Sequence, residues 1–233
     1  MKLLPLLVLA LILSLLSTTA VANVVLPLSG SPAVLIPAAG SAPGANGTFF
    51  RSDLTIVNLA AHDQLVALQW LPQGSTGNGA PPIVITIRAS NGLRSQDFVH
   101  DYLNTSGIGS IIVRGVTSSG APDSTALLYV SSRIWTPQPG TNGTTSQSFD
   151  AIPLDAIDSL GATVGAALFG TGSVGGDPAF RVNVGVVNVD SANTQLFNIN
   201  IDNGLGAPPP PPPIVLVVPP MSMQQIPVGN GDG

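Results

Sequence analysis

The sequence predicts an all-β protein, an antiparallel β-sandwich made of two related tandem units of which the second is truncated. Short apolar runs alternate along the chain with clusters of Gly, Pro, Asn, Asp and Ser, a pattern typical of sandwiches and barrels. The stretch FRSDLTIVN at residues 50–58 recurs at 180–188 as FRVNVGVVN, which indicates one supersecondary unit used twice. Beyond Lys2 the chain has no lysine and no glutamate, the residues that exposed helix faces normally carry.

The apolar runs place the strands of the first unit at residues 34–37, 53–59, 65–71, 83–88, 96–100, 110–116 and 126–135. A bridging segment at 147–154 leads to the strands of the second unit at 162–169, 181–189, 194–201, 214–218 and 223–228. One short helix is expected at 154–160, because Asp155 can start it. Six prolines at 208–213 form a polyproline loop between two strands, and we interpret this loop as a rigid spacer.

Alternation along the repeated strand predicts which side of it is buried. Phe50, Leu54 and Ile56 share one face, and Arg51 and Asp53 share the other. We therefore expect an apolar inner face and an ion pair between Arg51 and Asp53, which would contribute about 0–1 kcal/mol to stability at the surface.

An asparagine closes each copy of the repeated strand, Asn58 in the first and Asn188 in the second. Both lie on the apolar side of the alternation, where a polar side chain needs a structural reason. We expect each side-chain amide to bind turn backbone that has left the ladder, and we interpret both residues as structural turn anchors.

The N-terminus has the features of an export signal. Lys2 precedes an apolar run at 3–16, and Ala20-Val21-Ala22 supplies the small residues that a signal peptidase requires. We expect a signal peptide at 1–22, a first β-sandwich unit at 23–145 and a second, partial unit at 146–233. The rival interpretation is an uncleaved anchor, because apolar residues resume at 24–28. No span is expected after cleavage, and the destination is the periplasm, the cell surface or the extracellular space.

Composition and motifs argue against most kinds of chemistry. The chain is acidic, with a net charge of −5 and no basic clusters, which disfavours nucleic-acid binding. It has no cysteine and two histidines, His62 and His100, so neither a zinc site nor a catalytic triad is expected. The GxGxxG match at 170–175 is followed by Asp-Pro and a strand rather than by a helix, so it is not a dinucleotide site. We expect no catalytic residue, no cofactor and no metal.

The run Gly44-Ala45-Asn46-Gly47-Thr48, followed by Arg51-Ser52-Asp53-Leu54 and Val57-Asn58, resembles a secreted bacterial β-sandwich repeat family. Residues 131–135 and the connector at 143–153 are similar to a later strand of that family and to its link into the next copy. The resemblance implies an immunoglobulin-like sandwich and carries no established catalytic residues. The second copy departs from the pattern, because it lacks the GANGT loop and has no counterparts of the strands at 110–116 and 126–135.

These observations predict an exported, non-enzymatic structural or protein-interaction module. One alternative is a carbohydrate-binding or adhesion module that uses the loop at 38–47 and exposed aromatic residues. Another is a self-assembling surface subunit, completed by strand donation at the edge of the second unit. The partner would be a protein or a glycan at the cell surface. The candidate ligand contacts are Trp70, Arg51 and His62, although core packing and a plain turn are the simpler interpretations of Trp70 and His62.

Overall fold

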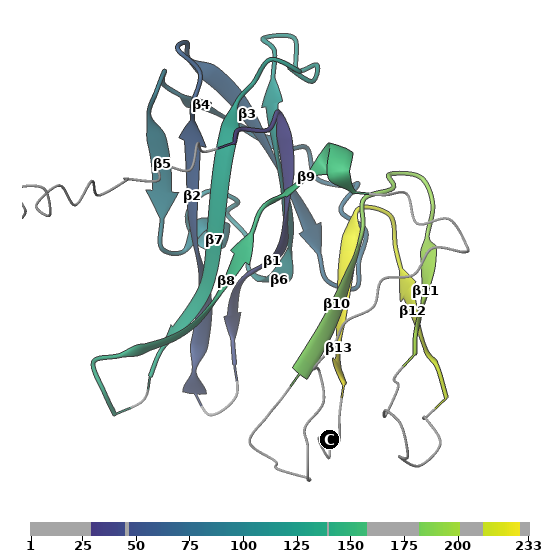
Figure 1. The fold of residues 1–233 in the computed structure, drawn as a ribbon. Coiled ribbons are helices and arrows are strands. Elements are labelled where there is room, and N and C mark those ends of the chain that lie inside the picture. Colours follow the sequence, from purple (N-terminus) through teal and green to yellow (C-terminus); the bar gives the residue numbers. More distant parts are fainter. Residues whose placement is uncertain (1–28, 45–46, 139, 158–181, 201–211, 229–233) are drawn as a thin grey trace, which may run out of the picture.

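The computed structural model describes residues 29–44, 47–138, 140–157, 182–200 and 212–228. These residues form an all-β, antiparallel fold (Figure 1), as the sequence predicts. The strands of the larger sheet are β1 (Ala33–Pro43), β2 (Phe49–Asn58), β3 (Gln64–Pro72), β4 (Ile83–Ile87), β5 (Gly92–Ser95), β6 (Gly107–Val116), β7 (Leu128–Pro137), β8 (Thr144–Asp150) and β9 (Ile152–Pro153). Four more strands follow: β10 (Val182–Asn188), β11 (Gln195–Ile199), β12 (Ile214–Val218) and β13 (Ser222–Val228).

The larger sheet has the strand order β4-β3-β6-β1-β2-β7-β8, with β5 paired to β2 and β9 to β1. Strand β1 pairs with β6 along most of its length and with β2 at its end, and its register shifts between Ile36 and Ala39. Pro37 lies in this irregular stretch, and the Ser110 hydroxyl donates to the Pro37 carbonyl at 2.7 Å. Because β1 belongs to both sides, the sheet folds over into two layers, β4-β3-β6 and β5-β2-β7-β8 (Figure 1).

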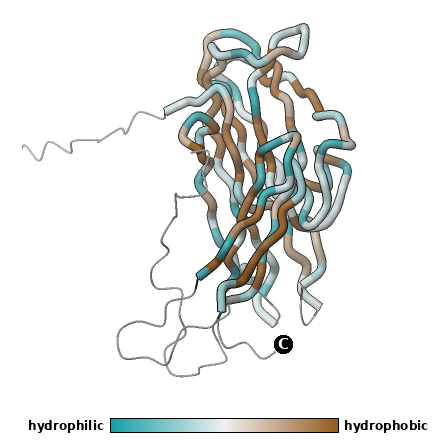
Figure 2. Tube along the Cα trace, turned by 90° about the vertical axis from the view of Figure 1, so that its right-hand side faces the viewer, coloured by the Kyte–Doolittle hydropathy of each residue, from teal (hydrophilic) through white to brown (hydrophobic). Residues whose placement is uncertain are grey.

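The main core lies between these two layers. Apolar residues recur along the strands (Figure 2). On β2 and β3, alternate residues are buried in this core, among them Leu54, Ile56, Val66 and Leu68. Leu54 and Ile56 on β2 are fully buried, as their alternation predicts. Phe50 is 37% exposed, so the expectation that it shares the buried face is wrong. Its ring lies against Gly44 at the rim of the sandwich, where a Cβ on that glycine would collide with it.

The predicted strand at 96–100 is also wrong. Strand β5 ends at Ser95, and residues Phe98–Asp101 form a short helix, α2. The Ser95 hydroxyl accepts the backbone N–H of Asp97 at 3.1 Å and donates to Asp101 at 2.5 Å. This serine turns the chain out of the ladder, and Phe98 and Val99 on adjacent positions of the helix both enter the core.

Several sequence expectations concern residues outside the described ranges. They include the strand at 162–169, the GxGxxG match at 170–175, most of the polyproline run and the signal segment. The helix expected at 154–160 corresponds in the described part to a single 3₁₀ turn, Leu154–Ala156, called η2. The domain boundary expected at 145/146 falls inside β8, which pairs with β7 through Asp150. No helix in the described ranges has the length and apolarity to cross a membrane.

Two hairpin-like pairs, β10–β13 and β11–β12, make up the described C-terminal part. The β11–β12 ladder contains five pairs and begins at Gln195↔Val218, and the β3–β4 ladder contains five pairs and begins at Gln64↔Ile87. Both strands are therefore displaced by 131 residues, with the register unchanged. The β10–β13 ladder likewise repeats the β2–β5 ladder, displaced by 130 residues on one strand and 131 on the other.

The C-terminal part packs on the outer face of the β3-β6-β1 layer (Figure 1). A second, smaller core forms there around the buried residues Leu35, Leu71 and Ile112. The side chains packed against it are Leu154, Ile157, Val187, Val189 and Met221.

The loop after β3 adds polar contacts to the same junction. The Gly74 N–H donates to the Met223 carbonyl at 3.0 Å, and the Asn78 amide donates to the Ser191 carbonyl at 2.6 Å. Apolar packing and hydrogen bonds together fix the C-terminal part to the first sandwich.

Candidate functional site

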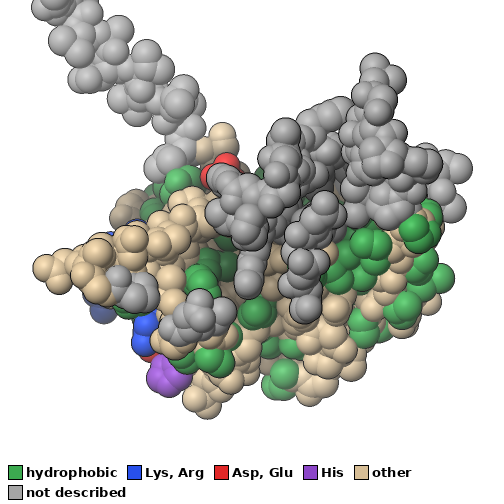
Figure 3. All heavy atoms as spheres, turned by 90° about the horizontal axis from the view of Figure 1, so that it is seen from below, with side chains coloured by type: hydrophobic (Ala, Val, Ile, Leu, Met, Phe, Trp, Pro, Cys, Tyr) green, Lys and Arg blue, Asp and Glu red, His purple; other side chains and the backbone are tan. Residues whose placement is uncertain are grey.

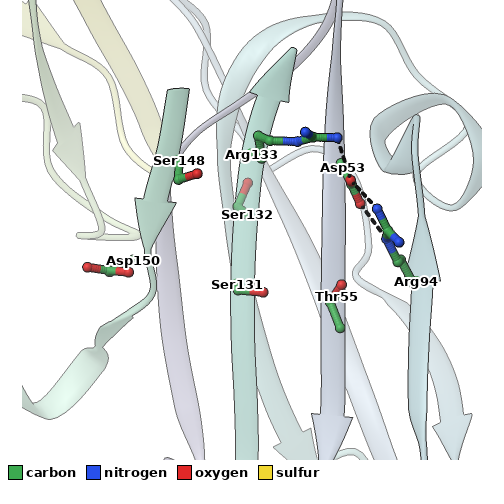
Figure 4. A pocket seen from close by; sticks show the side chains of 8 residues that line it. All are labelled: Asp53, Thr55, Arg94, Ser131, Ser132, Arg133, Ser148 and Asp150. Carbon is green, nitrogen blue, oxygen red and sulfur yellow. Dashed lines mark hydrogen bonds and ion pairs between the residues drawn. The ribbon is translucent and has the colours of Figure 1, made fainter. Parts of the chain in front are cut away.

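An ion-pair cluster lies on the outer face of β5-β2-β7-β8, with Asp53 at its centre (Figure 4). Arg94 reaches Asp53 from β5 and donates from Nε at 2.9 Å and from Nη2 at 2.6 Å. Arg133 donates from β7 at 3.0 Å. Asp53 is only 7% exposed, and the hydrogen bond from Arg94 is the largest of the effects that hold the pKa of this carboxyl below its ordinary value.

This arrangement corrects the expected ion pair between Arg51 and Asp53. The two residues do share the outer face of β2, but Arg51 pairs with Asp97 at 3.3 Å instead. Its guanidinium also lies 4.7 Å from the centre of the Phe49 ring and 5.7 Å from that of Trp135. Cation–π contacts of this kind compete with a carboxylate on the neighbouring outward position.

The cluster borders a shallow depression of about 370 Å³, which we call the polar ledge. Hydroxyl groups and charged groups of both signs line it, and the view in Figure 4 shows them spread over four adjacent strands. The lining residues are Asp53, Thr55, Arg94, Ser131, Ser132, Arg133, Ser148 and Asp150. Two arginines and two aspartates line the ledge, so their formal charges cancel, and both arginines pair with Asp53.

The structure does not bring the three candidate ligand residues together. Arg51 lies beside the polar ledge, on the strand that carries Asp53. Trp70 lies on β3 and packs against the main core, above Gly109 on the neighbouring strand, where a Cβ would collide with the indole ring. His62 is an exposed residue of the turn between β2 and β3, and its carbonyl accepts a hydrogen bond from Asn58.

Sequence reasoning missed Arg94 and Arg133 as members of the ledge. Arg133 occupies an outward position on its strand, which its alternation with buried Ser132 and Val130 could have shown. Arg94 falls between two predicted strands and had no such signal. Its partner, Asp53, is 41 residues away in the chain. At this separation the pairing of the two side chains depends on the topology of the folded sheet.

Asn58 is completely buried and organises the corner after β2. Its amide nitrogen donates to the carbonyls of His62 at 2.7 Å, Ile87 at 3.2 Å and Arg88 at 3.2 Å. Its amide oxygen accepts the N–H of Ala60 at 3.0 Å. A single side chain thus binds the turn that follows β2 and the end of β4.

Asn188 makes the same four contacts after β10. The amide nitrogen donates to the carbonyls of Asn193 at 2.8 Å, Val218 at 3.0 Å and Pro219 at 3.0 Å. The amide oxygen accepts the N–H of Asp190 at 3.0 Å. The turn between strands is one residue longer here than in the first copy, which accounts for the change of displacement from 130 to 131.

The outer face of the β11–β12 hairpin exposes large apolar side chains. Leu196 is 66% exposed, Val217 58% and Val215 56%. Hydrophobic side chains gather on the side of Figure 3 where β11 and β12 lie in Figure 1. Three exposed residues of this size on one small hairpin form an apolar patch, and such patches mark interaction sites more often than scattered surface residues do.

Neither histidine takes part in a site with several metal-ligating groups. Within the described ranges, no group of three or more His, Cys, Asp or Glu residues converges. The His100 ring is 3.1 Å from Asp101. The hydrogen bond from Ser95, and after it the one from His100, hold the pKa of the Asp101 carboxyl below its ordinary value. Both residues lie at the exposed end of α2, and their contacts stabilise the turn that this helix forms.

Comparisons with known proteins add no assignment. No family model matches the chain, and no curated protein is similar enough to count as a relative. Among solved structures, the chain is similar to the crystal structure of Thermotoga maritima 1070, at 15% identity and a TM-score of 0.34. The likeness covers 53% of this chain and 95% of that one, and at this score it carries no argument about fold or function.

Proposed function

We propose that the protein is an exported, non-enzymatic structural or protein-interaction module, built from one four-strand β unit used twice, that acts through its second copy. The observation that carries this proposal is the agreement between the two copies in register and in the asparagine corner. The export signal in the sequence supports the location outside the cytoplasm.

The agreement extends to backbone conformation at the corner. Ser90 and Met221, 131 residues apart, both adopt a positive φ, 51° and 49°. The Ser90 N–H donates to the Ala60 carbonyl at 3.0 Å, and the Met221 N–H donates to the Asp190 carbonyl at 3.0 Å. Non-glycine residues rarely take this conformation, so its recurrence at matched positions supports a duplication better than chance similarity of two hairpins.

The copies differ in what surrounds them. In the first, β2 pairs with β7 over eight residues and β3 pairs with β6 over eight. In the second, within the described ranges, β10 pairs with β13 and β11 with β12, and the single bridge Gln73↔Met223 is the one further pairing of these strands. An unpaired strand edge is a template for another strand, so the second copy is the part of the molecule suited to binding a protein.

Hydrogen exchange on the purified chain tests the proposal, because it measures whether amides are paired. We expect the amides of β11 to exchange much faster than the matched amides of β3 in dilute solution, and the β11–β12 peptide to become protected when a partner binds. Protection of β11 equal to that of β3 in the isolated monomer would refute an open second copy.

Export has its own measurement. Expression of the full chain in a bacterium should yield a product that begins at Asn23 and is found outside the cytoplasm. A product that keeps Met1 and sediments with membranes would show that the N-terminal segment is an uncleaved anchor. A cytoplasmic product would refute export.

A second candidate function, glycan binding, is favoured by the polar ledge. Its hydroxyl groups and paired charges can share hydrogen bonds with sugar hydroxyls, and Trp135 follows two residues after Arg133 on β7. A glycan screen tests this: Arg133→Gln should abolish binding, whereas Arg88→Gln, on an exposed arginine away from the ledge, and Trp70→Ala should retain it. Absence of binding to every glycan would eliminate this candidate.

A further inference from the structure

We infer that two copies of this chain pair through β11, antiparallel and about a two-fold axis, to form a continuous four-stranded sheet β12-β11-β11-β12. The inference rests on the proposed function and names its partner: a second copy of the chain, bound by strand addition at the β11 edge.

The first step compares matched positions in the two copies. Val66 on β3 is fully buried, whereas Phe197 at the same position of β11 is half-buried. Gln64 is buried and donates to the Val116 carbonyl on β6, whereas Gln195 is exposed and its amide reaches only Asp190 at 3.3 Å. The hairpins have the same register, so the difference comes from the strand that covers β3.

That strand is β6, and it shows what kind of partner the edge accepts. It pairs with β3 from Leu65↔Val116 to Pro72↔Gly109, and its central residues Ile111, Ile112 and Val113 are all buried. A partner for β11 must therefore supply an extended, apolar strand with free backbone donors and acceptors.

The β11 edge has none of the features that prevent such pairing. Natural edge strands are protected by charged residues, prolines or bulges. The five residues of β11, Gln-Leu-Phe-Asn-Ile, contain no charge and no proline, and neither does β12. Its five residue pairs with β12 run without a bulge. Among the described residues, β12 is the one strand that pairs with β11, so the other edge of β11 can accept a partner strand.

Charge favours a second copy as the occupant. The chain has a net charge of −5, so two copies repel each other over most of their surface. Strands β11 and β12 contain no charged residue. The Asp190 carboxylate lies 3.3 Å from the Gln195 amide at one end of β11, so repulsion between two copies is smallest when their β11 strands meet at the centre. With Phe197 on the two-fold axis, Leu196 of one copy lies beside Asn198 of the other, and the exposed Leu196, Val215 and Val217 of both copies join into one apolar surface.

The expected affinity is modest. A five-residue strand spans about 17 Å, and pairing such edges buries less surface than the roughly 1,200–2,000 Å² of stable interfaces. We therefore expect a reversible dimer that forms as concentration rises, rather than an obligate one.

Sedimentation equilibrium of the signal-free chain over a wide concentration range tests the dimer. The wild type should shift reversibly from one to two copies, and Leu196→Lys and Asn198→Lys, which place a charge on the pairing strand itself, should each remain monomeric. Val84→Lys is the matched control, because Val84 is the counterpart of Val215 on β4 and is similarly exposed, at 52%. This variant should dimerise as the wild type does. A strict monomer at all concentrations, or a dimer that both hairpin lysines leave intact, overturns the inference.

Cysteine cross-linking gives a readout that does not depend on weakening the fold. The chain has no cysteine, so Leu196→Cys, Phe197→Cys and Asn198→Cys each introduce one thiol. On the proposed axis, Phe197→Cys should form a disulfide dimer fastest, because paired Cα atoms in a ladder lie within disulfide reach. Equal, slow cross-linking of all three and of Val84→Cys overturns the proposal.

Failure here is distinguishable from failure of the proposed function. If β11 exchanges fast and the protein is a strict monomer, the proposed interaction module with an open β11 edge stands, and a second copy is eliminated as its partner. Slow exchange in β11 of the monomer eliminates both.

Discussion

Replacing Asn58 by alanine tests whether one buried amide holds the corner after β2. Its amide group contacts three carbonyls and one N–H. An amide nitrogen has only two hydrogens, so at most two of the three carbonyls receive a full bond, and the contacts amount to about three hydrogen bonds. At about 1 kcal/mol each, Asn58→Ala should lower the free energy of unfolding by about 3 kcal/mol.

Urea unfolding followed by fluorescence measures this loss, provided the slope with denaturant stays constant. Asn91→Ala is the control, since the side-chain oxygen of this exposed asparagine accepts the N–H of the adjacent Gly92 and its backbone bonds survive the substitution, so its cost should stay within about 0.5 kcal/mol. Asn58→Asp should cost more than Asn58→Ala, because it would place a second carboxylate oxygen against carbonyls. Equal stability of the Asn58→Ala and Asn91→Ala proteins would refute the anchoring role.

Three further predictions follow from contacts described above. Asn188→Ala should speed hydrogen exchange in β10 and β13 while β2 and β5 keep their protection, since the contacts it removes all lie in the second copy; loosening of both copies would contradict this. The pKa of Asp53 is lowered on folding, so its contribution to stability is present above the ordinary aspartate pKa and is lost as pH falls through the lower, folded-state value. Acid titrations of stability should accordingly be flatter for Asp53→Asn than for the wild type, and parallel curves would argue against the cluster. Gly109→Ala would place a Cβ against the Leu71 carbonyl and the Trp70 ring, and should cost about 1–3 kcal/mol; a neutral thermal melt would contradict the packing described for β6.

The alternation of apolar and polar residues was enough to predict the strands that have one buried face and one exposed face. Leu54 and Ile56 alternate with polar residues, and both are buried as expected. The all-β class followed from the same kind of signal repeated along the chain. Alternation fails at the rim of a sandwich, because the second layer is missing there. Phe50 has the right position in the pattern, but its ring lies against Gly44 at the rim and stays 37% exposed.

The polar ledge was beyond prediction for a different reason. The sequence offers several aspartates as ion-pair partners for Arg51, Arg94 and Arg133. Which aspartate each arginine meets depends on which strands become neighbours in the folded sheet. The partners of Asp53 come from 41 and 80 residues further along the chain. The strand wrongly placed at 96–100 shows a third limit of prediction from hydrophobic pattern. The Ser95 hydroxyl accepts the N–H of Asp97, so a side chain takes the place of a backbone partner at the end of β5. The pattern of apolar residues does not show where this happens.

Strand β1 pairs along most of its length with β6, which is synthesised long after it, and this sets the order in which the chain can fold. Its first residue, Ala33, lies opposite Arg114, so the ladder that joins the two layers closes only after about half the chain has been synthesised. Pairings so distant in sequence make folding slow. A nascent chain of this design cannot close this ladder while its N-terminus is already available, and the export proposed above requires a chain that has not yet folded.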